Sequence, residues 1–221
     1  RHHELVCRGS ATDELRRIVW HLDEPVADAA AIPTYLMAEA TKPRATVVLT
    51  GEGADELFAG YSHYKILTLA HALGRGGLAG PSVALGASSP LSRALALAAS
   101  LPRGAAAWLA LKTVFTDQEK RDLLAPSMRP PHGADPVERL VAAHLEADPC
   151  ADHLQRLLRL DLTYWLPDDL LVKVDRMTMA HAVEARVPYL DHRLVEASFR
   201  APASWKLRGG VSKYLLRCMA Q

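Results

Sequence analysis

The segment Val47-Val-Leu-Thr-Gly-Glu-Gly-Ala-Asp-Glu-Leu-Phe58 decides how the chain is expected to fold. The β-branched run at 46–50, which overlaps the start of this segment, predicts a short strand buried in a parallel sheet. The run then passes into a turn with Gly51 and Gly53, and a helical pattern follows at once. In a parallel sheet, such a junction gathers backbone N–H groups where ligands bind. The segment therefore predicts an α/β fold with a binding site at this turn.

The rest of the chain first alternates strands and helices and then becomes helical. An extended segment is expected at 2–6, and apolar spacing predicts helices over 12–22, capped by Thr12, and over 34–40. Beyond Tyr61, stretches rich in alanine and leucine predict helices alone. In the last third we expect helices over four ranges: 154–165, 167–181, 191–199 and from 212 onward.

Composition excludes several classes of protein. The 221 residues are 49% hydrophobic and 23% charged, values typical of soluble globular proteins. No apolar run reaches the roughly 18 residues of a membrane span without interruption, so we expect no membrane span. The net charge of +1 gives no electrostatic footprint for nucleic acid or a membrane surface. Cys7, Cys150 and Cys218 support neither a disulfide framework nor a zinc knuckle, and a reducing cytoplasm is expected.

The turn carries two carboxylates, Glu52 and Asp55, that an anion-binding turn alone does not explain. Carboxylates repel a phosphate unless a divalent cation or a basic substrate group lies between them. We therefore interpret Asp55 as a magnesium ligand and Glu52 as a base or anchor that faces the substrate. Alternatively, Asp55 and Glu56 simply complement a helix N-terminus, which leaves Glu52 unexplained. Rossmann, Walker, serine-hydrolase and zinc-protease motifs are absent from the sequence.

Asp175 and Arg176 interrupt a run, 167–181, that begins with a proline and is apolar nearly all round. This pattern predicts a helix that starts at the proline and is mostly buried. Buried charges need partners. The two residues are therefore expected either to line a site or to form a buried network with Glu184 and Arg186, and these interpretations are compatible.

The segment Gly209-Gly-Val-Ser-Lys-Tyr-Leu-Leu-Arg217 places a lysine where local rules disfavour one. Ser212 is predicted to cap a helix, so that Lys213 falls in the first turn. There the helix dipole disfavours a cation by roughly 0.3–1 kcal/mol. Such violations are expected at functional sites, and a lysine beside a Gly-Gly loop would clamp a phosphate or pyrophosphate. A solvated surface lysine is the alternative.

Together, the stretches 47–61, 166–181 and 184–193 resemble the glutamine-hydrolysing asparagine synthetase family, and 213–217 agrees in kind and order. The resemblance covers about 1–61 and 154–221. It implies an adenine-nucleotide α-hydrolase-like (HUP, or ATP pyrophosphatase) α/β fold, dominated by helices in its C-terminal two-thirds. We expect one partial synthetase domain over 1–221, with a divergent helical insertion over 62–151.

The resemblance also implies an activity, an ATP-dependent C–N ligase of asparagine biosynthesis. ATP and Mg²⁺ would adenylate the side chain of aspartate, and ammonia, taken from glutamine in the full-length enzyme, would attack the β-aspartyl-AMP. By position, Asp55 would bind magnesium, Glu52 would handle the acceptor and the amine, and Lys213 would stabilise charge on the phosphates. The remaining cofactor-binding residues implied are Thr50, Gly51, Gly53, Asp175 and Arg176.

Related activities stay open. β-Lactam synthetases usually carry a tyrosine at the position of Glu52, which argues against that relative. Amidotransferases of secondary metabolism or surface-polysaccharide assembly keep these motifs with other acceptors. A binding module that has lost catalysis would predict changes at Glu52, Asp55 or Lys213, yet all three residues are present. Small-molecule partners are expected, and a homodimer of the full-length enzyme stays open.

Two family features are missing from the sequence: a Ser-Gly-Gly-x-Asp-Ser pyrophosphate loop and the glutaminase domain with its nucleophilic cysteine. The segment 2–4 resembles the strand that follows that loop, and the last helical pattern stops without a cap. We therefore expect a fragment truncated at both ends, which lacks half of the ATP site.

We predict that this polypeptide alone is inactive, because the pyrophosphate loop would have to come from an upstream segment. Aspartate-dependent ATP–pyrophosphate exchange measures the adenylation step directly. Detectable exchange by the isolated chain would contradict the prediction.

Overall fold

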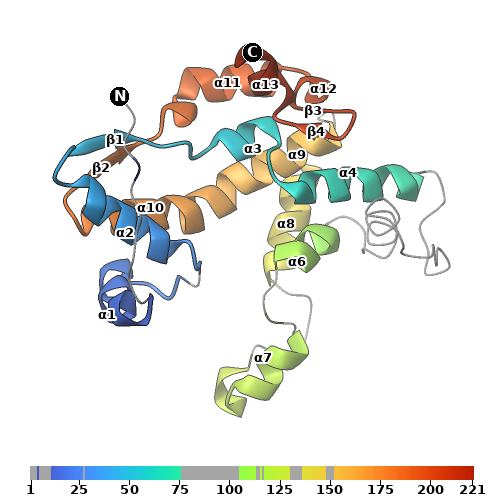
Figure 1. Ribbon diagram of the computed structural model, residues 1–221. Helices are drawn as coiled ribbons and strands as arrows, with labels where there is room; N and C mark the ends of the chain where they lie inside the picture. The colour runs from blue at the N-terminus through green and yellow to red at the C-terminus, as the bar shows by residue number, and fades with distance from the viewer. Residues whose placement is uncertain are drawn as a thin grey trace, which may run out of the picture. The chain divides into compact units, whose positions relative to one another are not determined.

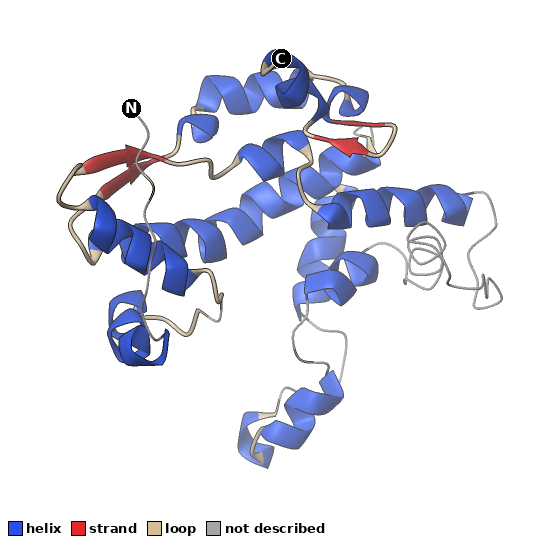
Figure 2. Ribbon diagram, in the orientation of Figure 1, coloured by secondary structure: helices blue, strands red, loops and turns tan. Residues whose placement is uncertain are grey.

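The computed structural model divides the chain into two compact units (Figures 1 and 2). The first unit comprises Arg1–Phe58 and Asp161–Pro202, and the second comprises Ala59–Leu160 and Ala203–Gln221. The structure describes residues 4, 11–26, 28–75, 105–112, 115, 117–129, 136–147 and 152–221. The strand predicted at 2–6 therefore lies outside the described residues, except for Glu4, which has no regular structure.

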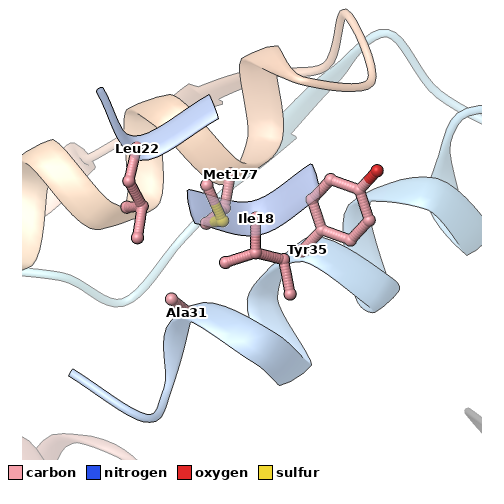
Figure 3. Close-up of a cluster of buried hydrophobic side chains, with 5 residues drawn as sticks. All are labelled: Ile18, Leu22, Ala31, Tyr35 and Met177. Carbon is pink, nitrogen blue, oxygen red and sulfur yellow. The ribbon is translucent and has the colours of Figure 1, made fainter. Parts of the chain in front are cut away.

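Three helices enclose the core of the first unit: α1 (Ala11–Leu22), α2 (Ala31–Thr41) and α10 (Val172–Met179). Their buried side chains meet in one cluster of Ile18, Leu22, Ala31, Tyr35 and Met177 (Figure 3). Ile18 and Leu22 lie one helical turn apart, as apolar spacing predicts. The two predicted N-terminal helices are thus confirmed, although α1 begins one residue before its predicted cap and α2 three residues before its predicted start.

A two-stranded parallel sheet lies beside these helices, formed by β1 (Val47–Leu49) and β2 (Glu184–Arg186). The predicted β1 is confirmed, whereas β2 was not predicted because its sequence Glu-Ala-Arg lacks β-branched residues. The predicted burial of β1 is wrong in the described part of the chain. There Leu49 is 73% exposed, since the sheet contains a single partner strand for β1.

The loops that follow the two strands pack against each other. After β1, the turn at 51–53 leads into α3 (Ala54–Phe58), and after β2 the chain forms the short helix η3 (Pro188–Leu190). Gly53 adopts a φ of +88°, and a Cβ at this residue would clash with Leu190 Cδ2. Helix α11 (His192–Arg200) then contacts α3, and its cap, Asp191, accepts a hydrogen bond from the N–H of Arg193 at 2.9 Å.

The helix predicted to begin at Pro167 does not begin there. Instead, α9 (His153–Leu160) is followed directly by the π-helix η2 (Asp161–Leu171), which contains Pro167, and then by α10. Proline lacks an N–H and its ring clashes with the preceding turn of an α-helix. A π-helical turn bonds i to i+5, so the wider turn accommodates the ring.

The residues of the second unit that the structure describes are mainly helical, as predicted. Besides α9, the described helices of this unit are α4 (Ser62–Arg75), α6 (Ala105–Lys112), α7 (Asp117–Leu123), η1 (Pro126–Met128), α8 (Pro136–Glu146), α12 (Ala203–Lys206) and α13 (Tyr214–Met219). Helices α4, α6, α8 and α9 contact one another, and Tyr64, Trp108, Val141 and Leu157 are buried among them. None of the described helices combines the length and the apolar character that a membrane span needs.

Ser212 does not cap a helix. It lies in a hairpin of β3 (Leu207–Arg208) and β4 (Val211–Ser212), opposite Leu207. Gly209 and Gly210 form the turn with φ of 55° and 78°, values that suit a two-residue hairpin turn. The glycine pair thus sets a turn that the capping pattern did not predict, and the helix cap moves to Lys213.

Alanine in place of Gly53 is expected to destabilise the protein by about 2 kcal/mol or more, because the positive φ and the contact with Leu190 both oppose a Cβ. Gly51→Ala is the matched control, since nothing lies within 4 Å of the position that its Cβ would take. We expect that variant to stay within about 0.5 kcal/mol of the wild type. Urea unfolding of both proteins measures the difference, and equal midpoints would contradict the expectation.

Candidate functional site

The predicted turn residues lie together at the carboxyl-terminal edge of the β1–β2 sheet. The backbone N–H of Thr50 donates to the Arg186 carbonyl at 2.9 Å and so fixes the first residue after β1. The Thr50 hydroxyl oxygen is buried without a hydrogen-bond partner. Gly51 next to it is exposed, with open space where a side chain would stand. A ligand can therefore approach the backbone of Gly51 closely, and the contact of Thr50 and Gly51 with ATP stays a prediction.

The glycine at position 53 is explained by packing within the protein. The residue is buried, and the space of its absent side chain is filled by Leu190 and Tyr189. Packing of η3 on the turn is a sufficient reason for glycine here. Its predicted contact with ATP stays a prediction.

An ion pair that sequence reasoning missed lies near Glu52. The ammonium of Lys173, on α10, donates to Asp28 Oδ2 at 2.5 Å, and the Lys173 residue is 5% exposed. Asp28 precedes α2, and its other oxygen accepts from the N–H of Ala30 at 2.8 Å. A lysine inside an apolar helical run was the available signal that a buried partner existed.

The electrostatics of the cluster distinguish Glu52 from its neighbours. Burial raises the pKa of the Glu52 carboxyl above its ordinary value; Lys173 opposes this shift, while Asp55 and Asp28 add to it. Burial alone would also raise the pKa of Asp28, but the bonds from Lys173 and from the Ala30 N–H bring it below its usual value. The Glu52 carboxyl, whose pKa is raised, therefore accepts a proton more readily than Asp28, whose pKa is lowered.

Asp175 and Arg176 lie on α10 but on its exposed side, whereas Val174 and Met177 are buried. The predicted buried network with Glu184 and Arg186 is wrong. Arg186 instead donates to Glu184 at 2.7 Å in an exposed pair within β2. The residues of α10 that contact α1 and α2 recur at helical spacing. The charged side chains of Asp175 and Arg176 therefore lie on the opposite face of the helix.

Asp55 stands in the first turn of α3. The described residues contain no group of three or more His, Cys, Asp or Glu side chains that could hold a metal ion. Magnesium, however, keeps several waters or phosphate oxygens and uses as few as one or two carboxylates. Asp55 therefore fits a magnesium ion that is also held by a bound phosphate.

Lys213 belongs to the second unit, whereas the other predicted site residues lie in the first. It is the N-cap of α13, and its carbonyl accepts from the N–H of Arg217 at 2.9 Å. Its φ of 51° is left-handed, a conformation that a lysine adopts at an energetic cost. Such strain concentrates at functional sites.

Comparisons with known proteins identify the family of the chain. The family model described as asparagine synthase matches residues 1–221. Asparagine synthetase [glutamine-hydrolyzing] 1 of Bacillus subtilis (strain 168) is 32% identical over 216 residues, which cover 95% of this chain and 33% of the relative. A putative asparagine synthetase [glutamine-hydrolyzing] of Mycobacterium tuberculosis (strain ATCC 25618 / H37Rv) is 34% identical over 219 residues, 92% of this chain and 31% of the relative. No solved structure matches significantly.

The chain thus spans about a third of the length of the curated relatives it matches. The match to the family model nevertheless extends over the whole chain, including residues 62–151. The chain belongs to the asparagine synthase family.

Proposed function

We propose that the chain is part of an ATP-dependent ligase that amidates the side chain of aspartate, with ammonia coming from glutamine in the full-length enzyme. The relatives are named glutamine-hydrolysing asparagine synthetases. The observation that carries the proposal is the half-buried Glu52, which lies between the buried Thr50 hydroxyl and Asp55 and interacts electrostatically with Lys173. A carboxylate so placed handles an amine and not a phosphate.

Five residues would hold the nucleotide and its metal. The Thr50 hydroxyl and the Gly51 backbone would bind ATP, and Asp55 would bind Mg²⁺. Asp175 and Arg176 present exposed charges and would contact the nucleotide from α10. ATP would transfer its adenylyl group to the carboxylate of the acceptor and release pyrophosphate, which would turn the carboxylate into a mixed anhydride with AMP as its leaving group.

Glu52 would act on the incoming amine. As the nitrogen of ammonia forms its bond to the activated carbonyl carbon, the nitrogen becomes positively charged and must lose a proton. Glu52 would accept that proton as the bond to the leaving group breaks. The Lys173 ammonium favours the ionised form of Glu52 and so opposes the protonation that burial promotes.

Lys213 would stabilise negative charge on the phosphates during the reaction. We further propose small-molecule partners, a cytoplasmic location and, for the full-length enzyme, a homodimer. The exposed free thiol of Cys218 suits a reducing compartment.

The test of this function is amide formation from aspartate, ATP and ammonia by the full-length enzyme, with AMP and pyrophosphate followed separately. Glu52→Gln is expected to lower the rate of amide formation by about 100-fold or more, because glutamine cannot accept the proton. The exposed Glu39→Gln, on α2, is the matched control and should keep the wild-type rate. Amide formation from another carboxylate but not from aspartate would replace the proposed acceptor.

The same assay has a pH dependence with a defined sign. Activity falls as the pH falls through the pKa of Glu52, which lies above the ordinary value of 4.5. Lys173→Met removes the charge that lowers this pKa and should move the acid limb to higher pH. Asp28→Asn removes a charge that raises it and should move the limb to lower pH. Shifts in the same direction in both variants would contradict the assignment of this limb to Glu52.

Lys213→Gly is expected to separate stability from activity. Glycine adopts a φ of 51° without steric cost, so the unfolding midpoint should not fall. The rate of amide formation should fall by about 100-fold or more, because the phosphate charge loses its partner. Retention of the rate within threefold would instead identify Lys213 as a solvated surface lysine.

A further inference from the structure

Lys206 is a buried lysine that the proposed chemistry does not use. It is the last residue of α12 and is 0% exposed. Its ammonium donates to Gln155 Oε1, on α9, at 3.0 Å. Burial lowers the pKa of Lys206 to about 8, so the surroundings disfavour its charge. A methionine or leucine would fill the same space without this desolvation, which indicates that the ammonium serves a specific contact.

The Lys206–Gln155 hydrogen bond holds the start of the β3–β4 hairpin. β3 begins at the next residue, and β3 pairs with β4 so that Leu207 lies opposite Ser212. Lys206 directly precedes β3, and Lys213 directly follows β4. The buried lysine and the proposed phosphate-binding lysine are therefore the two ends of the same hairpin.

Two further tethers of the hairpin lie at the surface. Arg208 donates to the Tyr214 hydroxyl at 3.3 Å, and Arg217 donates to the Ser212 carbonyl at 3.0 Å, both in exposed positions. A two-stranded hairpin is marginally stable by itself in water. A hydrogen bond from a charged donor in a buried site is stronger than such surface bonds. The partly buried Lys206–Gln155 bond, made by a fully buried lysine, is therefore a stronger anchor of the hairpin than the two surface bonds.

We propose that Lys206 is a positioning residue: by holding the first strand of the β3–β4 hairpin to α9, it sets the backbone position from which Lys213 acts. The proposal rests on the proposed function, since Lys213 needs a phosphate to act on. All the residues involved lie in the second unit. Lys206 itself is fully buried.

The experiment uses the full-length enzyme with Lys206→Met, which keeps the apolar stem and removes the donor. Hydrogen exchange of the backbone amides at 207–217, followed by mass spectrometry, should become at least tenfold faster, while exchange in α9 stays unchanged. The kcat for amide formation should fall at least tenfold with the KM for aspartate unchanged, because the position of Lys213 affects the phosphate and not the acceptor. Lys42→Met, which removes an exposed lysine that donates to the Ala182 carbonyl, is the matched control and should change neither quantity.

Gln155→Leu removes the acceptor and leaves Lys206 in place, so it should produce the same pair of changes and replaces Lys206→Met if that variant does not fold. Exchange within twofold of the wild type in both variants overturns the anchor. Faster exchange with an unchanged kcat overturns the link to Lys213. Hydrogen exchange needs no substrate, so a wild-type enzyme that forms no amide from aspartate would refute the proposed function while the exchange data still decide the anchor.

Discussion

The pairing of β1 with β2 is the constraint on which the candidate site depends. It joins two short strands that lie far apart in the sequence, and the bond from the Thr50 N–H to the Arg186 carbonyl extends the ladder into the turn. Because the strands are parallel, the segments that follow β1 and β2 leave the sheet at the same edge. Leu190 can then occupy the space that Gly53 leaves open. The geometry around Glu52 is therefore fixed by backbone bonds and by one close side-chain contact, not by the local sequence alone.

The charges at this edge would make the proposed binding of a metal by Asp55 and the proposed proton transfer to Glu52 interdependent. Lys173 is a single cation that interacts with both Asp28 and Glu52, while Asp28 and Asp55 raise the pKa of Glu52. A divalent cation on Asp55 would cancel one of the two charges that raise this pKa. Glu52 would then be ionised more fully when the metal is present than when it is absent. An arrangement of this kind favours the basic form of Glu52 when the metal-bound nucleotide is in place.

Local patterns predicted the elements whose signals are local. The strand, turn and helix at 47–58 follow from β-branched residues, two glycines and a helical run, and the structure contains all three. Elements that depend on distant partners were not predictable in this way. β2 is a strand because β1 pairs with it, and Lys173 is buried because Asp28, 145 positions away, meets it. Ser212 did not follow the pattern expected of it, since a hairpin turn competes with a helix cap for the same residues.

The hairpin illustrates why a mobile side chain benefits from a strained and anchored backbone. A lysine has a long, flexible stem, and each rotatable bond that must be fixed in the transition state lowers the benefit of the charge. If the backbone also moved, the ammonium would have to be positioned anew in every turnover. The glycine pair allows the tight turn of the hairpin, the left-handed Lys213 sets the direction in which the chain leaves it, and the buried Lys206, directly before β3, bonds to α9. The backbone strain at Lys213 and the desolvation of Lys206 both lower the stability of the fold. In return, a fixed backbone would reduce the entropy that is lost when Lys213 binds the proposed phosphate.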